Sequence, residues 1–220
     1  FNDTNVLEKE LQKGDVCAVI FEPIQGVGGL DVPENNFVLA MEKLCYRYDT
    51  ALVADEVQSG FSRSGTFFAF QNNNIKPHVI TMAKGMGNGF PIGGILVHPD
   101  VQPKYGMLGT TFGGNHLACT ASLAVLEILK KDRLQQRAKE MEVYFRNQAK
   151  KIHGAKIKGR GLMLGLEFDF EVGPLRKRLI YEKKIFTGGS SNKNVLRILP
   201  PLTVQKEHFD QLFDALEALL

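Results

Sequence analysis

Lys84 is the residue of this sequence whose surroundings most suggest covalent chemistry. It follows an apolar run, 79–83, and glycines stand at positions 85, 87 and 89. The run is typical of a buried strand, and the glycines let the backbone approach a ligand closely. A lysine at the end of a buried strand is costly unless its charge is neutralised or paired, and such burial favours the neutral amine that forms a Schiff base. Lys84 is therefore the candidate catalytic residue; the competing interpretation is a surface lysine that opens a turn.

Asp55 provides the charge that would complement this lysine, and it also follows an apolar run. A pyridinium cofactor needs an anion beside its ring nitrogen and an amine that holds its aldehyde. Asp55 and Lys84 supply both. Val57 would place an apolar side chain against the ring, and Gln58 could donate to a ring oxygen. The alternative for Asp55 and Glu56 is a turn or a helix-capping role.

The elements that must position these residues alternate between strands and helices. We expect strands at 16–21, 51–54, 79–83 and 92–97, and amphipathic helices at 2–14 and 37–48. This alternation is typical of an α/β unit with a mostly parallel sheet, in which ligands bind beyond the carboxyl ends of the strands. Glu22, Asp55 and Lys84 each stand where an expected strand ends. Three strands would therefore deliver them to one edge of the sheet.

The rest of the chain is expected to form a long helical region and a smaller unit. The helical region extends over 116–152, with Asn115 as its N-cap and a break near Asp132. Beyond it we expect strands at 162–168 and 195–199 and helices at 175–184 and 204–219. These elements predict a smaller α+β domain at 154–220, hinged near 154–161, after a larger domain at 1–153.

Composition and charge exclude several classes of protein. The 220 residues include 44% hydrophobic and 23% charged residues, which excludes disordered and fibrous chains. The net charge is +3 and the basic residues are scattered, so a nucleic-acid partner is not indicated. We expect no membrane span, because no apolar stretch is long enough, and no metal site, because the five histidines lack ligand spacing.

The cysteines and the first residue bear on compartment and completeness. Cys17, Cys45 and Cys119 form an odd set without CxxC spacing, which favours reduced thiols in a cytoplasmic compartment. Cys17 and Cys45 are most simply core residues of a strand and a helix. The chain begins at Phe1 in a polar stretch, and we expect it to be a piece of a longer protein.

Four motifs connect the sequence to a known family. They are Glu22-Pro23-Ile24-Gln25-Gly26, Ala54-Asp55-Glu56-Val57-Gln58-Ser59-Gly60-Phe61, Ala83-Lys84-Gly85 and Thr111-Phe112-Gly113-Gly114-Asn115. They resemble the class III aminotransferases, pyridoxal-phosphate enzymes of the aspartate-aminotransferase fold, and most of all the acetylornithine and ornithine (or succinylornithine) branch. The resemblance covers roughly the C-terminal half to two thirds of a typical member. It implies that 1–153 is the later part of the large cofactor-binding domain, with a long interdomain helix, and that 154–220 is the small domain.

The resemblance also implies roles for the residues of the sheet edge. Lys84 holds the cofactor as a Schiff base and then carries a proton between the substrate Cα and the cofactor carbon. Asp55 pairs with the pyridine nitrogen, Gln58 contacts the phenolic oxygen and Val57 packs under the ring. By the same resemblance, we expect Glu22 of the first motif to be a cofactor-binding residue.

Two further positions are expected to bind anionic groups. By resemblance, Thr111 reaches the cofactor phosphate of a neighbouring subunit, which implies a homodimer with shared sites. Arg197 matches the arginine that holds the substrate α-carboxylate, and a guanidinium between apolar strand neighbours suits a bidentate pair with a planar anion. The alternative for Arg197 is a surface arginine on an edge strand. Arg63 could be structural or could face a subunit.

One position departs from the pattern of the branch. A glutamate is common where this sequence has Val27. By resemblance, that glutamate can pair with the carboxylate-binding arginine, so Arg197 lacks this partner here. We expect Val27 to enlarge the pocket or to remove its charge, which would favour an acylated ornithine side chain.

The function implied by the resemblance is a transaminase of arginine biosynthesis. It would move the δ-amino group of N-acetyl- or N-succinylornithine to 2-oxoglutarate, giving the semialdehyde and glutamate. One alternative is another class III activity, such as ornithine or 4-aminobutyrate transamination or an aminomutase. A second alternative is an inactive structural or dimer-forming portion, because in the family the phosphate cup and the ring-stacking aromatic residue come from an earlier segment.

Overall fold

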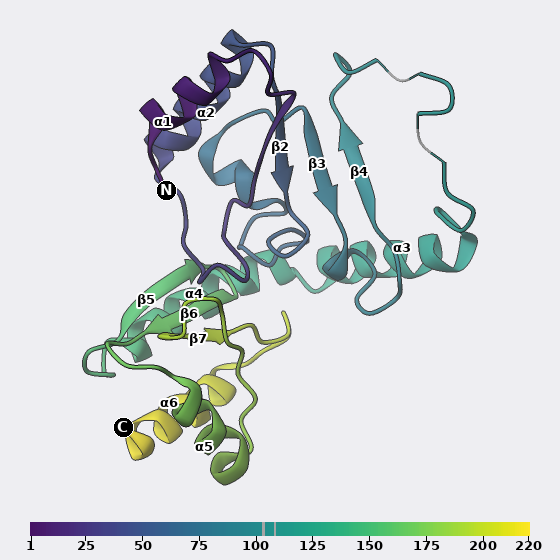
Figure 1. Cartoon of the computed structure of the whole chain (residues 1–220). Coiled ribbons are helices and arrows are strands. Elements are labelled where there is room, and N and C mark those ends of the chain that lie inside the picture. The colour runs from purple at the N-terminus through teal and green to yellow at the C-terminus, as the bar shows by residue number, and fades with distance from the viewer. Residues whose placement is uncertain (103, 108) are drawn as a thin grey trace.

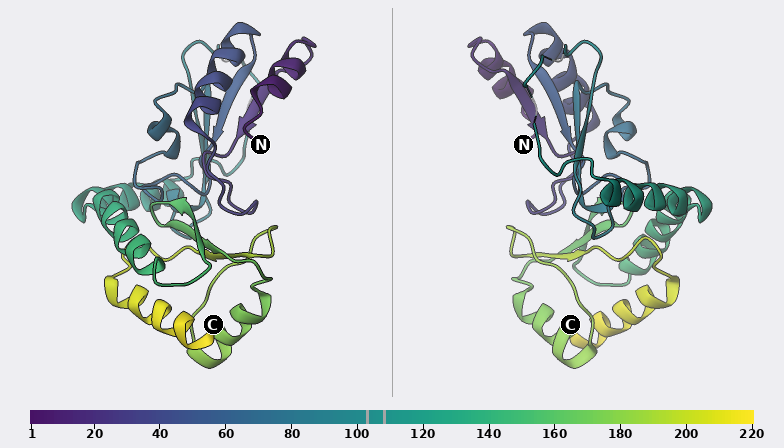
Figure 2. Two further views of the ribbon diagram at one scale, coloured as in Figure 1. Left: turned by 90° about the vertical axis from the view of Figure 1, so that its left-hand side faces the viewer. Right: turned by 90° about the vertical axis from the view of Figure 1, so that its right-hand side faces the viewer.

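The computed structural model describes residues 1–102, 104–107 and 109–220, and it contains two sheets. The four-stranded sheet carries helices α1 and α2 on its outer side, and the three-stranded sheet lies beside helices α5 and α6 (Figure 1). Helices α3 and α4 run between the two, as the turned views also show (Figure 2). None of the described helices is long and apolar enough to cross a membrane.

The first sheet is mixed but mostly parallel, as predicted. Its order is β1 (Ala18–Phe21), β2 (Ala51–Asp55), β3 (Val79–Met82) and β4 (Gly94–Val97). The first three strands are parallel neighbours, and β4 is antiparallel to β3. The carboxyl ends of β1, β2 and β3 therefore lie at one edge, and the arrows of β2 and β3 point toward the α3–α4 region (Figure 1).

Helix α2 (Asn35–Arg47) covers one face of this sheet, and α1 (Thr4–Leu11) packs beside it. Met41 and Cys45 of α2 lie in one apolar cluster with Leu52 of β2. Cys45 is buried, as predicted, but Cys17 is exposed, so its prediction as a core residue was wrong. The strand begins only at Ala18, and Cys17 lies at the solvent-exposed start of the sheet.

The other face of the first sheet is open to solvent in this chain. Ile20 of β1 is 68% exposed, and Val97 of β4, which lies on the same face through Val53 and Val79, is 43% exposed. All four residues of β3 are only half-buried. The prediction that a fully buried strand precedes Lys84 was therefore wrong, because the described chain covers this strand incompletely.

The long helical region consists of two helices, α3 (His116–Lys131) and α4 (Leu134–Ala149). The predicted break near Asp132 is therefore confirmed. Asn115 caps α3, with its side-chain oxygen accepting from the Ala118 N–H at 3.0 Å. Arg133 has φ of +49°, a left-handed conformation that cannot continue a helix. The chain therefore changes direction between the two helices.

The second sheet is antiparallel, with the order β5 (Lys156–Arg160), β6 (Met163–Glu167) and β7 (Val195–Ile198). Four predicted elements lie within a few residues of their expected ranges. They are β6, α5 (Gly173–Lys183), β7 and α6 (Lys206–Leu219). The segment 154–161, predicted to be a hinge, contains β5, a strand that the sequence did not predict; the hinge itself stays a prediction.

The missed strand β5 has a physical explanation. Its sequence contains two lysines and an arginine, so no apolar run marks it. Gly159 has φ of +82°, and an added Cβ would lie 1.9 Å from the carbonyl oxygen of Met163 on the neighbouring strand. This glycine therefore serves the tight pairing of β5 with β6.

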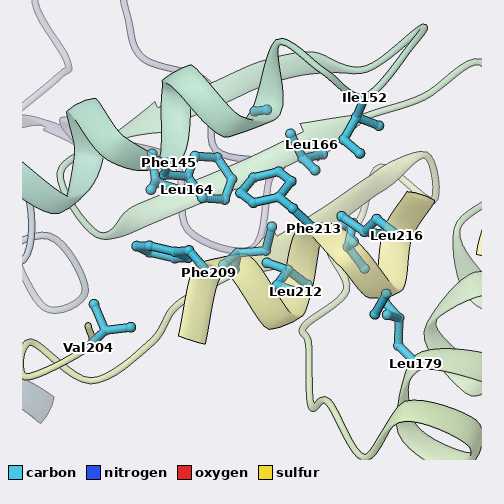
Figure 3. Close-up of a cluster of buried hydrophobic side chains, with 14 of the residues drawn as sticks. Phe145, Ile152, Leu164, Leu166, Leu179, Val204, Phe209, Leu212, Phe213 and Leu216 are labelled. Carbon is cyan, nitrogen blue, oxygen red and sulfur yellow. The ribbon is translucent and has the colours of Figure 1, made fainter. Parts of the chain in front are cut away.

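Most of the second core lies between β6, α4 and α6. Phe145 of α4 meets Phe209 and Phe213 of α6, and Leu164 and Leu166 of β6 lie on the same side (Figure 3). Leu179 of α5 closes the cluster and is also fully buried. Helix α4 thus shares its core with the second sheet, and a domain division at residues 153 and 154 stays a prediction.

Candidate active site

Three candidate residues lie at the carboxyl edge of the first sheet. Glu22 directly follows β1, Asp55 is the last residue of β2, and Lys84 stands two residues after the end of β3. Because these strands are parallel neighbours, the three residues lie at one edge, which was the placement predicted from the sequence.

Asp55 is held by hydrogen bonds that link two strands. Its Oδ1 accepts from the Val57 N–H at 3.0 Å and from the Thr81 hydroxyl of β3 at 3.1 Å. Within the described residues both of these bonds go to Oδ1, so Oδ2 remains able to accept a further hydrogen bond. The Val57 side chain that follows is half-buried.

Glu56 is buried directly beside Asp55 and fixes the turn that follows β2. Its Oε2 accepts from the Ser59 hydroxyl at 2.6 Å, and its Oε1 accepts from the Phe70 N–H at 2.8 Å. Burial raises the pKa of the Glu56 carboxyl, and these hydrogen bonds oppose that rise. The two neighbouring acids thus differ in burial: Glu56 is buried, whereas Asp55 is half-buried at the sheet edge.

Lys84 begins a short 3₁₀ turn, Lys84–Met86, and has φ of +43°. A left-handed conformation is uncommon for a residue with a side chain, and such strain often occurs at functional sites. The side chain is exposed, and no carboxylate among the described residues pairs with it. The expectation of a desolvated lysine was therefore wrong for this chain, because the strand before it is only half-covered.

A cavity of about 370 Å³ lies beside Lys84. Gln58 and Arg63 contribute polar groups to its wall, and Ile128 of α3 and Leu202 contribute apolar ones. Asp55, Val57 and Arg197 are not among its lining residues. The cavity thus joins the lysine to the loop after β2 and to helix α3.

Arg63 has a structural environment. Its Nη1 donates to the carbonyl oxygen of Leu162 at 3.3 Å and to that of Pro200, both in the second half of the chain. Burial lowers the pKa of its guanidinium. The structure therefore favours the structural interpretation that the sequence left open, and no local sequence signal could have identified carbonyls so distant in the chain.

Arg197 of β7 lies among neutral acceptors. Its Nη1 donates to the Gly189 carbonyl and its Nη2 to Gln58 Oε1, each at 3.2 Å, while its buried Nε has no partner within the described residues. Burial lowers the pKa of Arg197, and the charge of Glu22 partly opposes this effect. Since no described carboxylate lies within ion-pair distance, the guanidinium keeps its capacity for a carboxylate ligand.

The loop after β1 brings Glu22 toward this arginine. Glu22 Oε2 accepts from the Gly26 N–H at 2.8 Å, and Gly26 in turn lies against the Gln58 amide. Val27 is 56% exposed, and its carbonyl accepts from the Ser191 N–H at 2.8 Å. Val27 thus lies between the first sheet and the loop before β7, with an apolar side chain facing outward.

Thr111 is the predicted site residue that the structure does not bring to this group. It is exposed in the segment that leads from β4 to α3, where its neighbours Thr110 and Phe112 line a hollow with residues 90–93 of the loop before β4, and it is not among the residues that line the Lys84 cavity. Glu22, Asp55 and Lys84 thus share the sheet edge, and Gln58 links the Lys84 cavity to Arg197 of the second sheet.

The sequence matches the profile of the class III aminotransferases over residues 2–220. It is 40% identical to the acetylornithine aminotransferase of Aquifex aeolicus, covering 100% of this chain and 57% of that protein. It is 37% identical to ornithine aminotransferase 2 of Staphylococcus aureus, covering 96% of this chain and 54% of that protein. The chain thus spans just over half the length of these curated relatives.

Solved structures agree with this match. An ornithine aminotransferase from Plasmodium yoelii superposes with a TM-score of 0.90 at 30% identity, covering 100% of this chain and 61% of that chain. The ornithine aminotransferase of Toxoplasma gondii superposes with a TM-score of 0.91 at 29% identity, covering 100% of this chain and 55% of that one. That Toxoplasma structure has pyridoxal phosphate at partial occupancy in its active site.

Proposed function

Because this chain belongs to the class III aminotransferase family, a family of pyridoxal-phosphate enzymes, we propose that it carries the catalytic lysine of an acylornithine transaminase. The proposed reaction moves the δ-amino group of N-acetyl- or N-succinylornithine to 2-oxoglutarate, as a step of arginine biosynthesis. The observation that carries the proposal is that Asp55 and Lys84 lie at one sheet edge, where Gln58 lines the Lys84 cavity and also contacts Arg197 of the second sheet.

The residues of this edge fit pyridoxal phosphate. When bound, the cofactor supplies an aldehyde and an electron-accepting ring. Lys84 supplies the amine that holds the aldehyde, and its exposed side chain faces no competing carboxylate among the described residues. Asp55 holds a proton on the ring nitrogen through its open Oδ2, while Gln58 donates to the phenolic oxygen.

The remaining groups orient the ring and move the proton. Val57 packs against the ring face, and Glu22 lies at the same edge with its carboxylate fixed on the Gly26 N–H. The Lys84 amine would also move the proton of the substrate carbon that bears the reacting amino group, which is Cδ of the acylornithine and Cα of glutamate. The left-handed backbone conformation of Lys84 sets the direction in which its side chain leaves the main chain.

Arg197 binds the α-carboxylate of the substrate in this proposal. Its unpartnered Nε and its two weakly held Nη groups can exchange neutral acceptors for a bidentate carboxylate. Val27 is uncharged at the position where, by resemblance, a glutamate can pair with this arginine, so the pocket would suit the neutral end of an acylated side chain better than a free ammonium. This supports acylornithine over ornithine as the amino donor.

The proposed assembly is a homodimer with shared sites. Thr111 is exposed and lies outside the Lys84 group of its own chain, which supports the proposal that it reaches the cofactor phosphate of a second subunit. All three cysteines are free thiols, which supports a reducing compartment such as the cytoplasm.

A second candidate function is ornithine or 4-aminobutyrate transamination. The similarity to ornithine aminotransferases, both in sequence and in structure, is the observation that favours it. A chain spanning only part of its relatives could also serve as an inactive or dimer-forming portion, and an assay of the chain as it exists separates that outcome.

Substitution of Val27 tests the choice of substrate. We expect Val27→Glu to lower kcat/KM for acetyl- and succinylornithine about tenfold relative to ornithine, because by resemblance a glutamate at this position can pair with Arg197 and attract a free ammonium. Val6→Glu, also at an exposed valine but on α1, is the control. Unchanged ratios of kcat/KM among the three donors would contradict the proposed specificity.

A further inference from the structure

Gln58 is the side chain shared by the two halves of the site. It lines the cavity beside Lys84, and its Oε1 accepts from Arg197 Nη2 at 3.2 Å. The two partners are far apart in sequence, since Gln58 follows β2 and Arg197 belongs to β7. A single amide therefore contacts both the lysine cavity and the carboxylate-binding arginine.

The chemistry of the guanidinium fixes the orientation of this amide. Arginine can only donate, so Gln58 must present its oxygen to Arg197 and its NH₂ group elsewhere. Gly26 makes room for that NH₂ group, because a Cβ added at Gly26 would lie 1.9 Å from Gln58 Nε2 and 2.5 Å from Cδ. The backbone of Gly26 is itself held by Glu22 Oε2 at 2.8 Å.

We propose that Arg197 orients and polarises the Gln58 amide, and that this contact couples the carboxylate site energetically to the Lys84 site. The inference rests on the proposed function, in which the Gln58 NH₂ group donates to an anionic oxygen of the cofactor ring. A hydrogen bond from a cation to the amide oxygen strengthens the amide NH₂ as a donor. Arg197 and Gly26 are in this respect positioning residues.

The coupling has a predicted sign. A carboxylate that binds Arg197 neutralises much of the charge that the guanidinium shares with Gln58 Oε1, so the carboxylate and Gln58 compete for one cation even where Nη2 keeps an N–H for each. The less polarised amide donates more weakly to the ring oxygen. A bound carboxylate therefore weakens cofactor binding, and by linkage the cofactor weakens carboxylate binding by the same factor.

The first test uses glutarate, a dicarboxylate with neither an amine nor a keto group, and needs no cofactor. We expect Gln58→Met to bind glutarate about fivefold more tightly than the parent chain in calorimetry, because one competing hydrogen bond is gone. Met keeps the length of the side chain but cannot accept from Arg197. Weaker glutarate binding in Gln58→Met would overturn the inference, since it would mean that Gln58 itself binds the carboxylate.

The second test measures the coupling directly by titrating pyridoxal phosphate and following visible absorbance. Saturating glutarate is expected to raise the Kd of the parent about fivefold, a coupling typical of linked sites, and to leave the Kd of Gln58→Met unchanged. Gly26→Ala, which displaces the amide but keeps Gln58, should lose the coupling as well. The same glutarate effect in all three chains would overturn the inference, whereas no absorbance change in the parent would overturn the proposed function instead.

Discussion

At the scale of single residues, the site is held by hydrogen bonds to neutral groups. Asp55 is fixed by a backbone N–H and a hydroxyl, and Arg197 by a carbonyl and an amide. Neither the Asp55 carboxylate nor the Arg197 guanidinium has an ion-pair partner within the described chain, so both groups remain available to a charged ligand. This arrangement is expected of a site whose ions are completed by cofactor and substrate.

Glu56 is predicted to make stability depend on pH. Burial raises its folded-state pKa above the ordinary value of 4.5, so its favourable contribution is present below pH 4.5 and is lost as pH rises through the raised value. Glu56→Gln keeps the acceptor for the Phe70 N–H and removes the ionisation. Denaturant unfolding should therefore show the variant gaining stability relative to the parent as pH rises from 4.5.

The matched control for this substitution is Glu140→Gln on the exposed side of α4. The buried acid would be contradicted if the difference in free energy of unfolding between Glu56→Gln and the parent stayed constant across pH. It would also be contradicted if the variant lost stability relative to the parent as pH rose.

The cysteines provide a second prediction at the residue scale. Burial raises the pKa of the Cys45 thiol to about 11, with a smaller contribution from Glu42, whereas Cys17 and Cys119 are exposed. At pH 8 a disulfide reagent should modify Cys17 and Cys119 rapidly and Cys45 only after unfolding. Rapid reaction of Cys45 in the folded chain, read by peptide mass, would show that the α2 core is open.

Lys84 marks the limit of sequence reasoning at this scale. Its position after a strand and before glycines could be predicted, because both features are local. Its exposure could not, since it depends on which elements cover the sheet. The strained φ of Lys84 likewise has no signature in the residue types around it.

At the scale of elements, β5 and the loop after β1 hold the two sheets together. Lys158 of β5 is buried, and its ammonium lies 2.8 Å from Asp31 Oδ1 and 3.7 Å from Glu167 Oε1. Leu30, beside Asp31, is fully buried next to Gly165 of β6, where an added Cβ would lie 2.7 Å from Leu30 Cδ1. The loop that carries Glu22 is thereby fixed against the sheet that carries Arg197.

Removal of the buried ammonium should destabilise the chain. We expect Lys158→Met to lower the free energy of unfolding by about 1–2 kcal/mol, less than a fully buried pair would cost because Asp31 is partly solvated. Lys156→Met on the same strand is the control, since its side chain is 78% exposed and it should cost less than about 0.5 kcal/mol. Equal losses for the two variants in urea unfolding would mean that the Lys158 contact does not stabilise the chain.

The elements themselves were largely predictable, with β5 as the informative exception. Apolar runs located β1, β2 and β3, and helical periodicity located α2 and α6, because each of these signals lies within the element's own sequence. Strand β5 has no such pattern, because its burial depends on an ion pair with a loop more than a hundred residues earlier.

At the scale of the whole molecule, the candidate site spans both sheets. The contact between Gln58 and Arg197 joins residues 139 positions apart, and Arg63 reaches Pro200 over 137 positions. Helix α4 contributes Phe145 to the second core while α3 lines the Lys84 cavity. The relative position of the two sheets therefore decides whether Lys84 and Arg197 serve one ligand.

This long-range assembly is the part that sequence periodicity could not supply. Motif types identified Asp55, Lys84 and Arg197 separately, and parallel pairing predicted the common edge of the first two. The meeting of Gln58 with Arg197 depends on Gly26, whose missing Cβ leaves space for the amide. Such a requirement is visible only in three dimensions.

The central claim is that Lys84 holds pyridoxal phosphate in this chain. The most direct measurement adds the cofactor to the 220-residue protein, reduces the product with borohydride and locates the added mass by peptide mapping. We predict a visible absorption band and a label on Lys84, both retained in the exposed-lysine control Lys76→Ala and both lost in Lys84→Ala. A folded parent chain without the band, or a label spread over other lysines and unchanged in Lys84→Ala, would contradict the account.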